Sequence, residues 1–85
     1  MLYNDDERLF SEWVDNDYAI YNLVQRQAAK QLRLGNAKES ANALADFLEN
    51  RTAINSYPFS NITDDIDYSN VDFSKIAYDI LEELE

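Results

Sequence analysis

The chain has 85 residues, and its 17 Asp and Glu residues against 7 Lys and Arg residues give it a formal net charge of −10. It contains no Cys and no His, which excludes disulfides, thiolate nucleophiles, thiolate zinc sites and the imidazole that most often serves as a general base. The hydrophobic share of 46% and the aromatic share of 13% are those of a folding chain, so we expect a single small domain over residues 1–85.

The first residues form no basic and apolar leader, and the longest apolar run, residues 18–21, spans four positions. Neither export nor a membrane-spanning segment is expected from this pattern. We therefore expect a cytoplasmic protein.

Helices are predicted along most of the chain, because one Gly and one Pro leave few tight turns and no segment alternates apolar and polar residues. The first helix covers about residues 5–15. Asn4 followed by Glu7 resembles a capping box at its start. Its apolar stripe consists of Leu9, Phe10, Trp13 and Val14.

Two longer helices follow. The second, about residues 18–34, begins at a cap on Asn16 or Asp17 and is predicted to end at Gly35 in the left-handed conformation. Its apolar stripe consists of Tyr21, Val24, Ala28 and Leu32. The third, about residues 37–51, has a stripe of Ala37, Ala41, Leu44, Ala45 and Leu48.

Pro58 breaks the helical pattern. Phe59, Ile62 and Ile66 have the spacing of a short helix, and a last helix is predicted from Asp72 onward. The stripe of this last helix is Phe73, Ile76, Ala77, Ile80 and Leu84. The fold class predicted from these elements is all-α, a compact bundle of four to five short helices.

The charges are segregated along the chain. Residues 1–17 carry a net charge of −5 and residues 52–85 a net charge of −7, whereas residues 18–38 contain four bases and no acid. Arg26, Lys30 and Arg33 recur at helical spacing opposite the apolar stripe of the second helix. This basic strip is either a solvated face that pairs loosely with nearby acids, or a contact surface for an acidic partner or a second copy of the chain.

The acids of the last helix are crowded. Asp79, Glu82 and Glu83 fall on one flank with Lys75 as the single base nearby, and like charges at this spacing cost about 0.2–0.5 kcal/mol per pair. Acids near a helix C-terminus are also disfavoured by the helix dipole. Either this surface serves solubility, or its carboxylates imitate the phosphates of a nucleic acid. The predicted acidic face is Asp64, Asp65, Asp67, Asp72, Asp79, Glu82 and Glu83, with Tyr68 and Tyr78 as aromatic anchors.

The sequence gives little support for catalysis or for metal binding. The serines lack a recognisable adjacent base, and a domain of this size has little volume for a pocket that would hold paired carboxylates. Residues 65–69 begin like a calcium-binding loop, but Asn70 stands where that loop requires Gly and Ile76 where it requires Glu. We expect no enzyme activity, no cofactor and no dedicated metal site.

One segment has a family resemblance. Residues 70–81, NVDFSKIAYDIL, resemble a short element of ArdA-type antirestriction proteins, in which Val or Ile, Asp and an aromatic residue precede an apolar residue, Ala and a further Asp. The same element resembles small acidic phage and plasmid proteins of mostly unassigned function, and residues 5–13 followed by 16–18 are similar to that group. The matches cover roughly a third of the chain, which is shorter than an ArdA protein and has no β-rich portion. The resemblance implies a mobile-element protein that blunts a host defence by imitating DNA.

Two functions are therefore weighed. The first is a phage or plasmid inhibitor in a bacterial host, non-catalytic, whose acidic DNA-mimicking surface binds the basic cleft of a CRISPR effector or a restriction enzyme. The alternative is a small homo-oligomeric interaction or adaptor module, for example a homodimer, in which the basic strip meets the acidic face of another copy. Direct nucleic-acid binding is disfavoured, because a protein with a net charge of −10 is repelled by the phosphate backbone.

Overall fold

Four helices form where the apolar periodicity and the caps predict them. The computed structural model describes residues 2–84, apart from the side chain of Ala37. The helices are α1 (Asp5–Asn16), α2 (Tyr18–Leu34), α3 (Ala37–Ala53) and α4 (Phe73–Leu84), and two 3-10 turns, η1 (Phe59–Asn61) and η2 (Tyr68–Asn70), lie between α3 and α4. No strand occurs among the described residues. The all-α prediction is confirmed.

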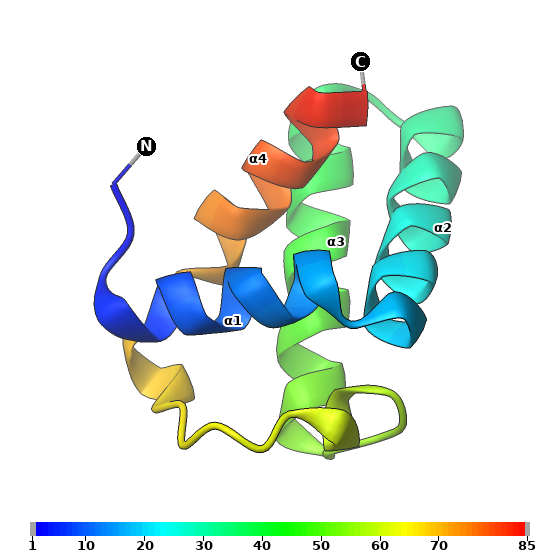
Figure 1. The fold of residues 1–85 in the computed structure, drawn as a ribbon. Coiled ribbons are helices and arrows are strands. Elements are labelled where there is room, and N and C mark those ends of the chain that lie inside the picture. Colours follow the sequence, from blue (N-terminus) through cyan, green and yellow to red (C-terminus); the bar gives the residue numbers. More distant parts are fainter. Residues whose placement is uncertain (1, 85) are drawn as a thin grey trace.

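The helices enclose one core. α3 packs most extensively against α4 and also against α2, while α1 packs against α2. Figure 1 shows α2 and α3 running in opposite directions, with α1 across the bundle and the 54–72 connection passing below α1 before it returns to α4. Phe10 of α1 is fully buried and meets Phe73 and Tyr68 edge-on, with ring centroids 5.5 Å and 5.8 Å away. The packing of these rings holds α1 against η2 and the start of α4.

Side chains cap the helix starts. The capping box at Asn4 is confirmed, because the Glu7 backbone N–H donates to Asn4 Oδ1 at 2.8 Å and the Asn4 N–H donates to Glu7 Oε1 at 3.0 Å. Asp17 caps α2 by accepting from the N–H of Ile20, and Asp72 accepts from the N–H groups of Ser74 and Lys75. Each carboxylate satisfies backbone donors that a helix start leaves without partners.

Two predicted stripes needed correction. Ile20 is fully buried on α2, while Tyr21, which was predicted on the apolar stripe, is 41% exposed. On α4, Leu81 is buried, whereas Leu84 in the last described turn is 39% exposed. The predicted position of Ala37 on the α3 stripe lies outside the described side chains.

The predicted helix over residues 59–66 is wrong. Only η1 forms, and the chain then runs irregularly to η2. Phe59 and Ile66 are nevertheless buried, and Ile62 packs against the core. The spacing of Phe59, Ile62 and Ile66 correctly indicated which residues face the core. Three apolar positions are too few to distinguish a helix from an irregular chain that packs along the core.

α3 ends later than predicted because of Asn55. Its φ of 52° lies in the left-handed region, which Asn tolerates better than most residues. The N–H of Ser56 donates to the carbonyl of Arg51 at 3.3 Å, and the N–H of Asn55 donates to that of Thr52 at 3.2 Å. These bonds form a Schellman motif, which satisfies the last carbonyls of the helix.

The left-handed conformation predicted for Gly35 is also wrong. Its φ of −154° and ψ of −176° are extended backbone that any residue adopts. The end of α2 is held instead by Ser40 of α3, which is buried and donates its hydroxyl to the Gln31 carbonyl at 2.9 Å. A hydrogen bond from a side chain of α3, and not a left-handed glycine, thus satisfies a carbonyl at the end of α2.

Replacing Gly35 by Ala is expected to leave stability unchanged or to raise it by up to about 1 kcal/mol, because Ala restricts the unfolded chain. The added Cβ would approach Glu39 Oε2 at 2.9 Å, and this atom ends a flexible side chain that can move aside. Urea denaturation of the two proteins measures the difference. A loss of more than about 1 kcal/mol would contradict this expectation and would show that Glu39 does not move aside for the added Cβ.

Candidate protein-binding surface

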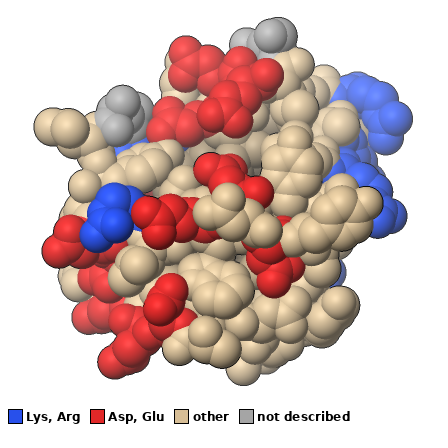
Figure 2. Space-filling model, viewed as in Figure 1, with Lys and Arg blue, Asp and Glu red and all other residues tan. Residues whose placement is uncertain are grey.

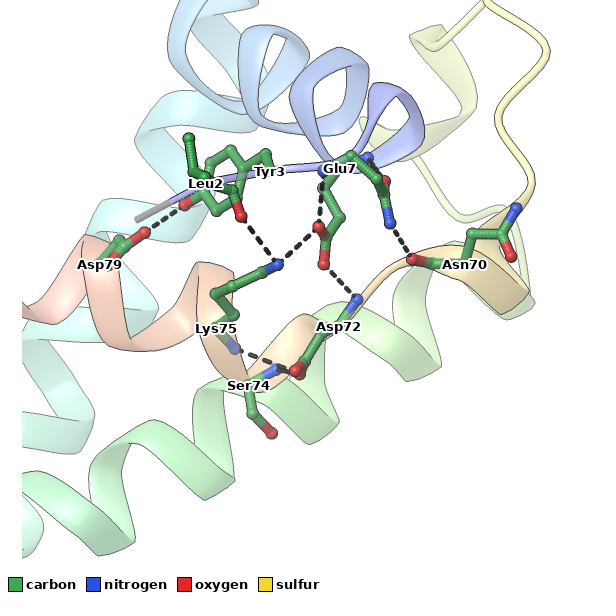
Figure 3. A network of polar contacts seen from close by, with 9 residues as sticks. Leu2, Tyr3, Glu7, Asn70, Asp72, Ser74, Lys75 and Asp79 are labelled. Carbon is green, nitrogen blue, oxygen red and sulfur yellow. Dashed lines mark hydrogen bonds and ion pairs between the residues drawn. The ribbon is translucent and has the colours of Figure 1, made fainter.

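A buried carboxylate joins α1 to α4. The side chain of Glu7 is 2% exposed and accepts hydrogen bonds from Lys75 Nζ at 2.7 Å, from the Asp72 N–H at 2.9 Å and from the Asn4 N–H at 3.0 Å (Figure 3). Burial opposes the ionisation of Glu7, but the hydrogen bonds from Lys75, Asn4 and Asp72 outweigh it, so its pKa lies below the usual value. Glu7 is therefore a charged clamp between the two helices.

The N-terminal segment is fastened to the same place. Lys75 Nζ also donates to the Leu2 carbonyl at 3.1 Å and lies 5.4 Å from the centre of the Tyr3 ring. The Tyr3 hydroxyl donates to Asp79. Burial, together with the hydrogen bond to Asp79 and the nearby acids, raises the pKa of Tyr3. Figure 3 shows these groups converging between the start of the chain and α4.

This network brings the acids of the two chain ends together. Ser11 of α1 lines a hollow of about 370 Å³ with Tyr3, Asp79, Glu82 and Glu83. Figure 2 shows Asp and Glu side chains over the end of α4, along α1 and over the chain below α1, whereas the larger group of Lys and Arg lies at the edge formed by α2. Acidic side chains from elements far apart in the sequence therefore gather on the same face, in groups separated by uncharged residues.

Asp6 extends that surface toward η2. Its side chain accepts from the Asp67 N–H at 3.2 Å and from Asn70 Nδ2 at 3.0 Å. The acids of α1 therefore lie directly beside those of the 64–72 segment.

The seven predicted acids have different local roles. Four accept hydrogen bonds from uncharged donors: Asp64 from the Trp13 indole, Asp67 from Ser69, Asp72 from the start of α4, and Asp79 from Tyr3. Asp65, Glu82 and Glu83 are exposed and make no side-chain hydrogen bond within residues 2–84. Over the same residues, none of the seven forms an ion pair. Hydrogen bonds thus hold four of the seven carboxylates in place, and none of the seven is in contact with a base among these residues.

The nearby bases are occupied elsewhere. Lys75, the base expected to relieve the α4 acids, pairs with Glu7. Arg8 lies 3.6 Å from Asp5 and 3.4 Å from Glu12, both exposed pairs. Exposed pairs of this kind contribute about 0–1 kcal/mol each.

The basic strip faces water. Arg26, Lys30 and Arg33 are exposed on α2, and no ion pair involves them within the described part of the chain. Of the two predicted anchors, Tyr78 is 50% exposed. Tyr68 is half-buried, stacks on Phe73 with ring centroids 6.3 Å apart, and belongs to the core packing. Tyr18, which is 80% exposed at the start of α2, was not predicted as a surface aromatic.

Acidification is expected to destabilise the protein through Glu7. Because the folded state holds the pKa of Glu7 below its unfolded value, the resulting stability is present above pH ~4.5 and is lost as the pH falls through the folded pKa. The measurement is the unfolding free energy between pH 7 and pH 3 for the wild type and Glu7→Gln, at constant ionic strength. The wild type should lose more stability on acidification than the variant; parallel curves would contradict the assignment.

Comparisons with known proteins did not identify a related protein. No protein-family model matches this chain, and neither a curated protein nor a solved structure was found to match it. Within residues 2–84, no group of three or more acidic side chains is arranged to hold a metal ion. None of the described helices has the length and apolar character needed to span a bilayer.

Proposed function

We propose that the protein is a phage- or plasmid-encoded inhibitor of a nucleic-acid-directed defence enzyme, and that its acidic surface occupies the basic cleft where that enzyme binds DNA. The observation that carries the proposal is the gathering of Asp and Glu side chains over the end of α4, along α1 and over the chain below α1 (Figure 2). The seven predicted carboxylates have no ion-pair partner within the described residues. The resemblance of residues 70–81 to ArdA-type proteins points the same way.

The chemistry of such binding is electrostatic complementarity. A nucleic-acid cleft presents Lys and Arg side chains that neutralise phosphates, and a rigid carboxylate array offers them the same sign of charge. Opposite potentials also steer the two proteins together before contact. The internal hydrogen bonds to Asp64, Asp67, Asp72 and Asp79 fix their positions, so little side-chain freedom is lost on binding.

A charge reversal tests the proposal without disturbing the fold. The variant is Asp65→Lys, Glu82→Lys and Glu83→Lys, which replaces the three acids that make no side-chain hydrogen bond or ion pair within residues 2–84. The control reverses Glu39, an exposed acid of α3. Asp46 and Glu49 of α3 are left unchanged, because they line a hollow together with Asp72 of the acidic face. Both are expressed in bacteria that carry individual restriction or CRISPR systems, and the efficiency of transformation by a targeted plasmid is measured.

The wild type and the α3 control should raise transformation at least 100-fold against one or more systems, and the acidic-face variant should not. Circular dichroism should show the same helicity for all three proteins. Protection that survives in the acidic-face variant, or a wild type that protects against no system, would contradict the proposal.

A second candidate function rests on the basic strip, which forms no ion pair within residues 2–84. In that case Arg26, Lys30 and Arg33 contact the acidic side chains of another copy, since the larger group of bases lies at the edge formed by α2, away from the acids at the end of α4 and below α1 (Figure 2). Light scattering should then show a dimer or larger assembly in 0.05 M salt that dissociates above about 0.5 M, where charges are screened within ~5 Å. A monomer at low salt would eliminate this candidate.

A further inference from the structure

The only tryptophan of the chain lines a hollow in the acidic surface. The hollow lies between the end of α1 and the chain that follows η1, has a volume of about 360 Å³, and is lined by Glu12, Trp13, Asn16, Asp17 and Asp64. Three of these five side chains are carboxylates, and none is a base.

The indole ring is held in position. Its Nε1–H donates to Asp64 Oδ2 at 2.7 Å, and the ring packs partly against the core. The second oxygen of Asp64 has no hydrogen-bond partner within the described residues. Trp13 and Asp64 thus line the hollow side by side, joined by this hydrogen bond.

An aromatic ring together with carboxylates favours an organic cation as the ligand of this hollow. Within residues 2–84 the carboxylates do not converge as metal ligands do. A cation above an aromatic face is attracted by the ring, and Trp gives the strongest such attraction. A guanidinium group satisfies both features at once, because it stacks on the ring while its N–H groups donate to carboxylate oxygens.

We propose that this hollow receives one arginine side chain of the protein partner, stacked on Trp13 and hydrogen-bonded to Asp64. The inference rests on the proposed function and names one contact of that interface. The volume lies at the lower end for ligand pockets, which suits a single side chain better than a cofactor. Glu12 is shared with Arg8 and Asp17 caps α2, so Asp64 is the carboxylate most available to the guanidinium.

The fluorescence of Trp13 reports directly on the hollow, because no other tryptophan contributes. The probes are acetylated and amidated triarginine and trilysine peptides, titrated at low salt. Triarginine should give a saturable change in emission and bind at least threefold more tightly than trilysine. No saturable change with triarginine, or equal affinities for the two peptides, would overturn the proposal.

Asp64→Asn is the informative variant, because its amide oxygen can still accept from the indole while the charge is removed. It should weaken triarginine binding at least fivefold. Glu83→Gln on α4 removes one charge elsewhere on the acidic surface and should change the affinity less than twofold. Equal weakening by the two variants would show general charge attraction only and would overturn the proposal.

The two proposals can fail separately. Protection in the transformation assay without peptide binding at Trp13 would leave the inhibitor function standing and remove the arginine site. Peptide binding that requires Asp64, in a protein that protects against no defence system, would retain the site and remove the inhibitor function.

Discussion

Replacing Lys75 by Met is expected to lower the free energy of unfolding by about 3 kcal/mol, a typical cost of removing one partner of a buried ion pair. The loss follows because Glu7 is 2% exposed and would keep only backbone donors against its charge. The long apolar part of the side chain is retained by Met. Urea denaturation at pH 7 measures the change.

Lys38→Met is the matched control, since Lys38 is exposed and has no ion pair in the described residues. It should cost less than about 0.5 kcal/mol. The double variant Glu7→Gln, Lys75→Met should recover at least about 1 kcal/mol relative to Lys75→Met, because no buried charge remains. Similar losses for Lys75→Met and Lys38→Met would show that the clamp does not stabilise the fold.

Phe10→Ala is expected to be the most destabilising single change in α1, with a loss of about 3–5 kcal/mol from lost burial and the cavity left behind. Phe10 is fully buried and contacts rings from η2 and α4. A small domain has a total stability of only about 5–10 kcal/mol, so this variant should be partly unfolded at 37 °C.

Phe10→Leu retains much of the volume and should lose distinctly less than Phe10→Ala. Chemical denaturation compares the three proteins. If Phe10→Ala lost less than about 1.5 kcal/mol, the aromatic contacts of α1 would not be central to the core.

Local sequence signals predicted most of the fold. The capping box at Asn4, the cap at Asp17 and the start of α4 at Asp72 all lie within a few residues of the groups they bind. The left-handed conformation predicted for Gly35 was wrong because the Ser40 hydroxyl binds the end of α2 instead. This contact depends on the tertiary packing of α3 against α2, which local sequence does not reveal. The 59–66 segment was misjudged because tertiary packing, and not helical periodicity, buries its apolar residues.

The candidate surface was only partly predictable. The density of acids on α4 and in residues 64–72 is visible in the sequence. Their junction with α1 depends on contacts spanning most of the chain, from Glu7 to Lys75 and from Tyr3 to Asp79. The capping-box pattern did mark Glu7, but a cap is usually exposed, and nothing local indicated that this carboxylate would be buried against Lys75. The hollow at Trp13 likewise depends on tertiary folding, which places Asp64 beside the end of α1.

The most direct measurement is competition with DNA on the defence enzyme that the transformation assay identifies. The purified protein is titrated against that enzyme at several DNA concentrations, and the concentration giving half inhibition is determined. If carboxylates take the place of phosphates, that concentration should rise in proportion to the DNA present, and the Asp65→Lys, Glu82→Lys, Glu83→Lys variant should not inhibit. Half inhibition at the same protein concentration whatever the amount of DNA would contradict DNA mimicry.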